Sequence, residues 1–311
     1  MMKNLLFSSK LLFLVGLMLV SVNMAAATRA YGGAFARNNT SSVNHFLTVG
    51  LSAGYSTLID SYDDLSTQGG MGGFLGVGYE MRINHFYCSL GAEMQLLNAT
   101  ADWNLGVQDQ HSLDTQGKPM IMHYEFDPIT EYQRLMYVQI PLMLGYYQRG
   151  FYFGAGFKVG IPVVASATQL SSYKTSATYN EYVDDFSGIP NHGYDTYKLD
   201  QTEDLTANIK FSLAAEVGYD VLTSVRRTKE GMRHGLRIAA VCEYGLNNVL
   251  GVQNQKATDM FEVNPKNATQ VSVKPFYETQ SLTGNFVNSL YAGIKFTWIC
   301  DFSRIPCDCD E

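Results

Sequence analysis

The sequence predicts an all-β protein: an eight-stranded antiparallel up-and-down transmembrane β-barrel. Apolar and polar residues alternate along eight segments of roughly ten residues each, the length that a tilted strand needs to cross a bilayer. Short and long connections alternate between these segments, and aromatic residues gather near the segment ends. The mean hydropathy of −0.08 fits this fold, because a wall that alternates lipid-facing and inward-facing residues averages to nearly zero.

The composition excludes several other classes of protein. Of the 311 residues, 13% are aromatic and 16% are charged, and there are 28 glycines against 8 prolines. A disordered chain, a collagen or a coiled coil would have a different balance. The net charge of −7 disfavours nucleic acid as a partner, because neutralising phosphates requires a basic surface. No stretch approaches eighteen consecutive apolar residues, so a membrane-spanning helix is not expected.

The N-terminus predicts export. Residues 1–27 read as a secretory signal peptide, with cleavage after Ala27 or Ala30, because Lys3 and Lys10 come before a short apolar core and small residues follow it. That core is too short for a stable membrane-spanning helix. We expect residues 28–44 to be a short periplasmic segment, residues 45–299 to form the barrel and residues 300–311 to be a periplasmic tail that contains cysteines.

The eight segments follow the two-residue period of a strand. In chain order they cover residues 47–56, 73–82, 86–96, 136–146, 151–162, 208–220, 236–245 and 289–298. The first segment is typical, because Leu47 and Leu51 lie on one face while Thr48 and Ser52 lie on the other. The fourth separates less cleanly, since Met143 falls on its polar face. We expect the apolar faces to contact lipid and the other faces to point inward.

The connections predict the orientation. Three are short or moderate, at residues 83–85, 147–150 and 222–234, and the other four are long, at residues 60–70, 98–131, 164–206 and 246–285. This alternation is typical of periplasmic turns and extracellular loops in an outer-membrane barrel with both termini in the periplasm. Ten strands remain an alternative if residues 175–183 or 270–279 pair within the wall.

Aromatic residues on the outward faces are placed near the strand ends, as in the aromatic girdles of membrane proteins. Rings of this kind favour the membrane interface because an apolar body sits in lipid while a polar atom reaches water. The predicted girdle consists of Tyr79, Phe86, Tyr146, Phe151, Tyr219 and Trp298 near the periplasmic rim and Tyr55 and Tyr244 near the other.

The inward faces carry equal numbers of acidic and basic residues. The predicted ion-pair network consists of Glu80, Glu93, Glu216, Asp220 and Glu243 with Arg82, Lys158, Lys210, Arg237 and Lys295. A charge in an enclosed interior is costly unless it is paired, so this balance favours a filled lumen over a selective aqueous pore. Eight strands also leave an interior just wide enough for side chains.

The long connections are strongly acidic. Asp60, Asp63 and Asp64 cluster in the first, and Asp184 and Asp185 in the third. Simple solvation of the loops explains such clusters, and attraction of divalent cations or of a cationic partner is the sharper alternative. No spacing matches an EF-hand or another calcium loop, so we predict no defined metal site and no cofactor.

One hairpin carries a family resemblance. Residues 135–147 read LMYVQIPLMLGYY and residues 150–156 read GFYFGAG. This pair resembles the core hairpin of the small outer-membrane β-barrel family of Bacteroidota, PorT-like and related to OmpA/OmpX-type barrels. The resemblance implies an outer-membrane location and lipid as a partner, and the PorT likeness implies a component of a secretion or assembly machine. The chain departs from the family at Gln139 and Gly145, where charged residues are common.

The last strand resembles a second family feature. Tyr291, Gly293, Phe296 and Trp298 are similar to the β-signal of outer-membrane proteins, which implies that the barrel assembly machinery is a partner during biogenesis. Physically, such a segment is an edge strand that can pair with another edge before the barrel closes.

Cysteines and histidines give weaker signals. In an oxidising periplasm Cys300 could form a disulfide with Cys307 or Cys309, which we favour over a zinc site. Three histidines have acidic neighbours in the sequence, namely His111 beside Asp109 and Asp114, His123 near Glu125, and His192 near Asp195. None has a diagnostic spacing, so we do not expect an enzyme.

The sequence therefore leaves three functions open. The first is a non-catalytic outer-membrane barrel with a mostly closed lumen, whose acidic extracellular loops serve envelope integrity, surface recognition or adhesion. The second is a channel for small solutes. The third is the secretion or assembly component that the family resemblance implies.

Overall fold

The computed structural model describes residues 43–63, 65–113, 119–179, 195–223, 233–251, 259–264, 269–279 and 285–301. The signal peptide and most of the predicted periplasmic segment and tail lie outside these residues. Nearly all of the described chain is β-structure, arranged as one antiparallel sheet of eleven strands and one small sheet of two. No helix among the described residues is long and apolar enough to cross a membrane.

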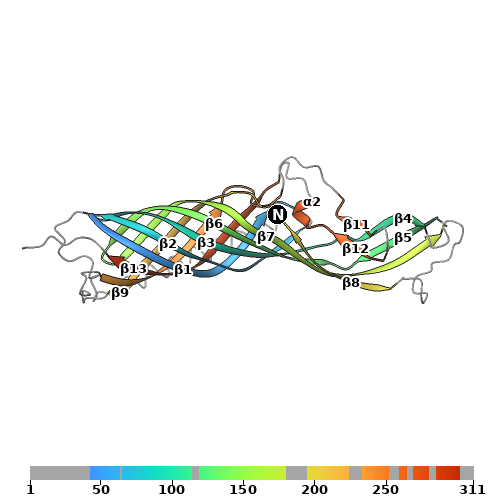
Figure 1. Ribbon diagram of the computed structural model, residues 1–311, viewed down its shortest axis with the longest axis horizontal. Helices are drawn as coiled ribbons and strands as arrows, with labels where there is room; N and C mark the ends of the chain where they lie inside the picture. The colour runs from blue at the N-terminus through green and yellow to red at the C-terminus, as the bar shows by residue number, and fades with distance from the viewer. Residues whose placement is uncertain are drawn as a thin grey trace, which may run out of the picture.

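Eight long strands of the large sheet form a closed ring (Figure 1). They are β1 (Val43–Asp60), β2 (Ser66–Ile83), β3 (Phe86–Trp103), β6 (Ile129–Gln148), β7 (Phe151–Tyr179), β9 (Lys210–Thr223), β10 (Arg233–Gly245) and β13 (Val287–Asp301). Each pairs with its neighbour in this order, β7 pairs directly with β9, and β13 returns to β1, so that no ring strand lacks a neighbour on either side. This part of the fold is called the ring below.

The ring strands begin and end slightly outside the predicted barrel limits. β1 starts at Val43, two positions before the expected start, and β13 ends at Asp301, two positions after the expected end. Tight turns join two of the pairs. In the turn between β6 and β7, Arg149 and Gly150 have φ of 52° and 87°, and positive φ at both central residues is the signature of a type I′ hairpin turn.

Two of the four segments predicted as long loops are largely strand, so the prediction that they lack regular structure was wrong. Residues 98–131 contain the end of β3, the hairpin β4 (Val107–Leu113) and β5 (Pro119–Phe126), and the start of β6. Residues 164–206 contain the second half of β7 and β8 (Thr196–Asp204). Beyond the ring, β7 pairs with β5 on one side and β8 on the other.

This extension, made of β4, β5, β8 and residues 164–179 of β7, is called the arm. It continues the long axis of the molecule at the end opposite the short turns (Figure 1). Neither segment of the ten-strand alternative adds a strand to the ring: residues 175–179 pair in the arm, while residues 271–279 form β12 and a helical turn.

A small cap lies where the ring meets the arm. It consists of the hairpin β11 (Phe261–Val263) and β12 (Val271–Val273) and the helical turn α2 (Phe276–Thr279). Phe276 packs edge-on against Tyr62 at 5.3 Å between ring centroids and also contacts Trp103. The inner face of the arm, including Tyr124, packs against Phe261 of β11. The cap thus joins the two parts through one apolar core.

Candidate functional site: the interior of the ring and the face of the arm

The end of the interior near the short turns holds two acids and two bases. Arg237 on β10 donates from Nη1 to Glu80 Oε2 at 2.8 Å and from Nε to Asp220 Oδ1 at 2.9 Å. Arg82 donates from Nε to the other Glu80 oxygen, Oε1, at 2.6 Å. All four side chains are almost fully shielded from solvent. Their formal charges cancel, which is the condition under which buried charges are tolerated.

Aromatic rings enclose the two guanidinium groups. Arg82 lies between Phe46 and Tyr147, with ring centroids 4.3 and 4.0 Å from its guanidinium carbon. Arg237 lies over Tyr152 at 4.2 Å. A cation is attracted to the face of an aromatic ring, and the attraction is stronger where water is absent. The rings therefore stabilise the arginines and also fill the space around them.

A second group of charges lies deeper in the ring. Lys158 Nζ contacts Glu93 Oε2 at 2.8 Å and Glu243 Oε2 at 3.1 Å, while Lys210 Nζ contacts Glu243 Oε1 at 2.5 Å. Lys210 also donates to Gln95. All four charged side chains are buried, and they come from four different strands. The lysines thus cross-link the wall of the ring from within.

Glu216 and Lys295 form the remaining pair, at 2.9 Å. Tyr87 donates its hydroxyl to the other oxygen of Glu216 at 3.3 Å, beside the first group of charges. The structure thus brings each of the ten charged residues singled out in the sequence into an ion pair inside the ring. The sequence did not indicate the aromatic rings that pack between these charges, because Tyr87 and Tyr152 fall on the inward face without any pattern of their own.

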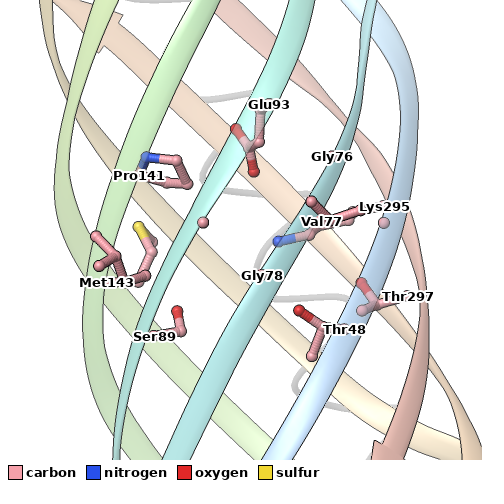
Figure 2. A pocket seen from close by; sticks show the side chains of 13 residues that line it. Thr48, Gly76, Val77, Gly78, Ser89, Glu93, Pro141, Met143, Lys295 and Thr297 are labelled. Carbon is pink, nitrogen blue, oxygen red and sulfur yellow. The ribbon is translucent and has the colours of Figure 1, made fainter.

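One small cavity lies in this region. Its volume is about 40 Å³, and Figure 2 shows Glu93 and Lys295 among the lining side chains, above Thr48, Thr297 and Ser89 in this view. A single water needs roughly 10–15 Å³ of such space, so the cavity holds a few water molecules at most. Both polar and apolar residues line it, and the polar part includes the Lys295 ammonium, the most exposed of the ten charged groups.

Apolar and aromatic side chains fill the other half of the interior, toward the arm. Phe74, Tyr137 and Tyr291 are 3%, 0% and 1% exposed. The hydroxyls of Tyr291 and Ser52 share a hydrogen bond of 2.5 Å, and Tyr137 donates to the Val249 carbonyl at 3.3 Å. Phe276 and Tyr277 of the cap close the mouth above them. The interior is therefore filled by ion pairs at one end and by apolar packing at the other.

Glu131 lies at this mouth as a buried carboxylate. It accepts hydrogen bonds from Gln133 Nε2 at 2.8 Å, Gln169 Nε2 at 3.0 Å and the Phe276 amide at 3.0 Å. Burial raises the pKa of the Glu131 carboxyl, and these hydrogen bonds oppose that rise. The contact with Phe276 ties the α2 turn to the wall. Sequence reasoning placed Glu131 in a loop and gave it no role.

The outside of the ring is apolar. Large hydrophobic side chains are exposed on every ring strand, including Leu51, Leu75, Leu90, Ile140, Phe153, Phe211, Tyr244 and Phe296. Leu51 is 57% and Leu75 56% exposed. On β6 this apolar belt runs from Tyr146 to Met136, and Arg134 is the first charged outward residue beyond it. Exposed apolar surface of this extent marks a surface that contacts something other than water.

The residues of the predicted girdle lie on the outward face. Tyr55, Tyr79, Phe86, Tyr146, Tyr244 and Trp298 are exposed, and Phe151 and Tyr219 are half-buried. Several contact histidines near the short turns: Tyr146 stacks on His85, Trp298 stacks on His234, and the Tyr79 hydroxyl lies 2.5 Å from His45 Nδ1. Polar partners on aromatic rings suit an interface between an apolar and an aqueous phase.

The predicted β-signal lies on the strand that closes the ring. β13 pairs with both β1 and β10, and Phe296 and Trp298 face outward. Gly293 lies opposite Gly54, and a Cβ added at Gly293 would lie 2.5 Å from the Tyr291 hydroxyl oxygen. The same Cβ would lie 2.6 Å from the Ala53 carbonyl oxygen, so the close approach of the neighbouring strand favours glycine at this position.

The acidic and cysteine predictions fall partly outside the described residues. Asp60 accepts hydrogen bonds from the Tyr62 amide and the Thr67 hydroxyl, while Asp64, Asp184 and Asp185 are not described. Within the part of the chain that the structure describes, no group of three His, Cys, Asp or Glu residues could hold a metal ion. Cys300 is buried, and Cys307 and Cys309 lie outside the described residues, so the disulfide stays a prediction.

The arm shows a contact that sequence proximity did not indicate. Asp109 pairs across the β4–β5 hairpin with His123, not with its sequence neighbour His111. The His123 Nδ1 donates to Asp109 Oδ1 at 2.7 Å, and its Nε2 lies 2.8 Å from the Thr178 hydroxyl. The three residues lie in a row on the open face of the arm, where they hold β4, β5 and β7 in register. Asp114 and His192 lie outside the described residues.

A search with protein-family models and a search of curated proteins found no match to this chain.

Proposed function

We propose that this protein is a non-catalytic outer-membrane β-barrel with a closed lumen that presents its arm outside the cell for recognition or adhesion. The observation that carries the proposal is the inverted distribution of side chains. The ring buries ten charged groups in ion pairs and exposes large apolar residues around its whole circumference. A protein in water would have the opposite arrangement, because exposed apolar surface and buried charge both cost free energy there.

The ends of the ring support the orientation. The two described turns at one end are short, whereas the arm and the cap extend from the other end. Outer-membrane barrels have short periplasmic turns and longer extracellular connections. The predicted signal peptide and the family resemblance of residues 135–147 support the same location.

The filled interior favours a surface role over transport. A solute would have to displace both the charged groups and the apolar plug of Phe74, Tyr137 and Tyr291. The remaining cavity of about 40 Å³ does not admit solutes larger than water. We therefore assign no conductance to the resting protein. The family resemblance implies a role in a secretion machine, but no contact among the described residues supports that role.

Two measurements test this proposal. The mature polypeptide should require detergent or lipid to stay monodisperse, and in planar bilayers it should give no stable unitary conductance. A monodisperse protein in plain buffer would contradict the membrane location. Stable unitary conductance from purified protein would instead favour a channel, and stoichiometric co-purification with an envelope partner would favour the secretion component.

A further inference from the structure

Strand β4 is an edge strand that ends the large sheet. It pairs with β5 and has no neighbour on its other side among the described strands. The strand lies along the outer part of the arm (Figure 1), and five of its seven residues are exposed. An open edge presents unpaired backbone N–H and C=O groups that can bind another strand.

The two edges of the arm differ in their charge. Strand β8, at the other edge, carries Lys198, Asp200, Glu203 and Asp204 within nine residues. Charged residues and proline are the usual protection of an edge against pairing. Strand β4 has one charged carboxylate, Asp109, and neither lysine nor proline. Of the two edges, β4 is therefore the one suited to pairing.

The hydrogen bonds of the hairpin determine which backbone groups of β4 are open. In an antiparallel pair, residues alternate between those that bond the neighbour and those whose N–H and C=O point the other way. The Phe126 amide donates to the carbonyl of Gly106, just before β4, at 3.1 Å. Even-numbered residues of β4 therefore bond β5. The odd-numbered residues, Val107, Asp109, His111 and Leu113, present their backbone groups to the open edge.

The sequence of β4 is complementary to itself in the antiparallel direction. When two copies are aligned about Gln110, Val107 lies opposite Leu113 and Asp109 lies opposite His111. Val107 and Leu113 are 60% and 65% exposed, so this alignment would cover apolar surface on both copies. Asp109 would meet a hydrogen-bond donor in His111. All four of these residues are the odd-numbered ones with open backbone groups, so the same alignment also forms a continuous ladder.

We propose that β4 pairs with β4 of a second copy of this chain, antiparallel and centred on Gln110. An antiparallel pair reverses the strand direction, and the strands of the arm run along the long axis of the molecule (Figure 1). The two rings then lie at opposite ends of the dimer. If the ring spans the outer membrane, as proposed above, the second copy belongs to a facing membrane, and the arm is a homophilic adhesion surface.

A cysteine at the centre of the pairing tests it directly. Gln110 would face its own counterpart in a non-hydrogen-bonded pair, with Cα atoms about 4.5 Å apart, which a disulfide can bridge. Gln110→Cys in the full chain in detergent should therefore give a disulfide-linked dimer on mild oxidation. Gln108→Cys is the matched control, because in this register Gln108 faces Ser112 and the two copies of Gln108 are more than about 13 Å apart.

The register predicts one further combination. Gln108→Cys alone and Ser112→Cys alone should stay unlinked, whereas their mixture should give a cross-linked dimer. Equal cross-linking of Gln110→Cys and Gln108→Cys, or failure of the mixture to cross-link, would overturn the pairing. Gln110 is exposed, whereas Gln108 and Ser112 are half-buried, so correct folding of each variant is checked on the same samples by resistance of the strands to proteolysis.

A charge exchange tests the proposed contact between side chains. His111→Asp places two carboxylates opposite each other on each side of the dimer, and Asp109→Lys places a lysine opposite a histidine. Each variant alone should bind itself about tenfold more weakly than the native chain does. In a mixture of the two variants one pair joins the introduced carboxylate to the introduced lysine, the other is the native Asp109–His111 contact, and binding should recover. If both variants stay folded and their mixture does not recover binding, the proposed register is contradicted.

Vesicles separate this proposal from the proposed membrane location. Phospholipid vesicles that carry the native chain should cluster, and vesicles that carry His111→Asp should not. Cross-linking of Gln110→Cys in detergent without clustering of vesicles would support the strand pairing and count against an outward-facing arm. No cross-linking in detergent would overturn the pairing, whatever the vesicles do.

Discussion

Arg237 and Glu80 lie on strands that are not neighbours in the ring, yet Arg237 Nη1 donates to Glu80 Oε2 at 2.8 Å. In the ring β13 and β1 separate β10 from β2, so this contact crosses the interior instead of following the wall. It is bidentate, because Nη2 donates to the other oxygen at 3.2 Å. Such a contact couples strands that share no backbone hydrogen bond.

Removal of one partner of this contact should lower the free energy of unfolding. Glu80→Ala leaves Arg237 and Arg82 with Asp220 as their remaining carboxylate, and we expect a loss of about 3–5 kcal/mol in the free energy of unfolding. The measurement is urea unfolding in lipid vesicles. Glu203→Ala on the exposed edge strand β8 is the control and should change stability by less than about 0.5 kcal/mol. Equal losses would contradict the burial of the Glu80 network.

The outward face should not tolerate charge inside the apolar belt. Leu75→Arg places a cation in the middle of the belt and should cost roughly 2–4 kcal/mol if lipid covers this face. Leu170→Arg, at an exposed position of β7 within the arm, is the matched control and should change the free energy of unfolding little. The free energies of unfolding of both variants in vesicles check this. A protein surrounded by water would show no difference between the two substitutions.

Close packing of β7 against Tyr87 gives a third prediction. A Cβ added at Gly154 would lie 1.8 Å from the Tyr87 hydroxyl oxygen, which donates to Glu216. Gly154→Ala should therefore destabilise the protein by about 1–3 kcal/mol through overpacking, and Tyr87→Phe in the same chain should relieve part of that loss. Gly50→Ala is the milder control, because its nearest neighbour is the flexible Lys295 side chain at 3.3 Å. Additive losses in the double variant would contradict the contact.

Glu131 should make stability depend on pH. Its pKa is raised by burial, so the folded protein keeps a proton at a pH where the unfolded chain has lost it. The stabilisation is fully present below the ordinary pKa of about 4.3 and decreases as pH rises from there to the raised value. Glu131→Gln should remove this dependence. The measurement is the difference in unfolding free energy between the native chain and Glu131→Gln as a function of pH.

The control for this dependence is Glu125→Gln, because Glu125 is an exposed residue of β5. That substitution should leave the pH dependence of stability unchanged. A native chain that gains stability as pH rises above the ordinary carboxyl range, relative to Glu131→Gln, would contradict the predicted direction.

Alternation in the sequence predicted the ring strands but not the arm. Along the ring, Leu47 and Leu51 alternate with Thr48 and Ser52. The leucines lie on the apolar outer face, and Thr48 and Ser52 lie on the inner face, which the ring encloses. In the extension of β7 the contrast is lost: residues 165–172 are Ala, Ser, Thr, Gln and Leu with no alternating pattern. The outward face of this segment is polar, and the inward face also carries polar groups such as Gln169. The sequence of the segment therefore resembles that of a loop.

Contacts across the interior were beyond sequence reasoning for a different reason. The sequence indicates that Glu80 and Arg237 share a face of the sheet, but the partner of each depends on how far the strands are displaced along the ring. The same holds for His123, whose carboxylate partner follows from hairpin register, not from distance in the chain.

The sequence alone determined the secondary structure of the ring, the choice of inward and outward faces, and the equal numbers of acids and bases among the ten residues of the ion pairs, since each depends only on the alternation of neighbouring side chains. Only the tertiary structure decided which charges meet, that Phe74, Tyr137 and Tyr291 close the other half of the interior, and that β4 is left as an open edge. Those features arise from strand register and ring closure, which bring together residues that are far apart in the chain.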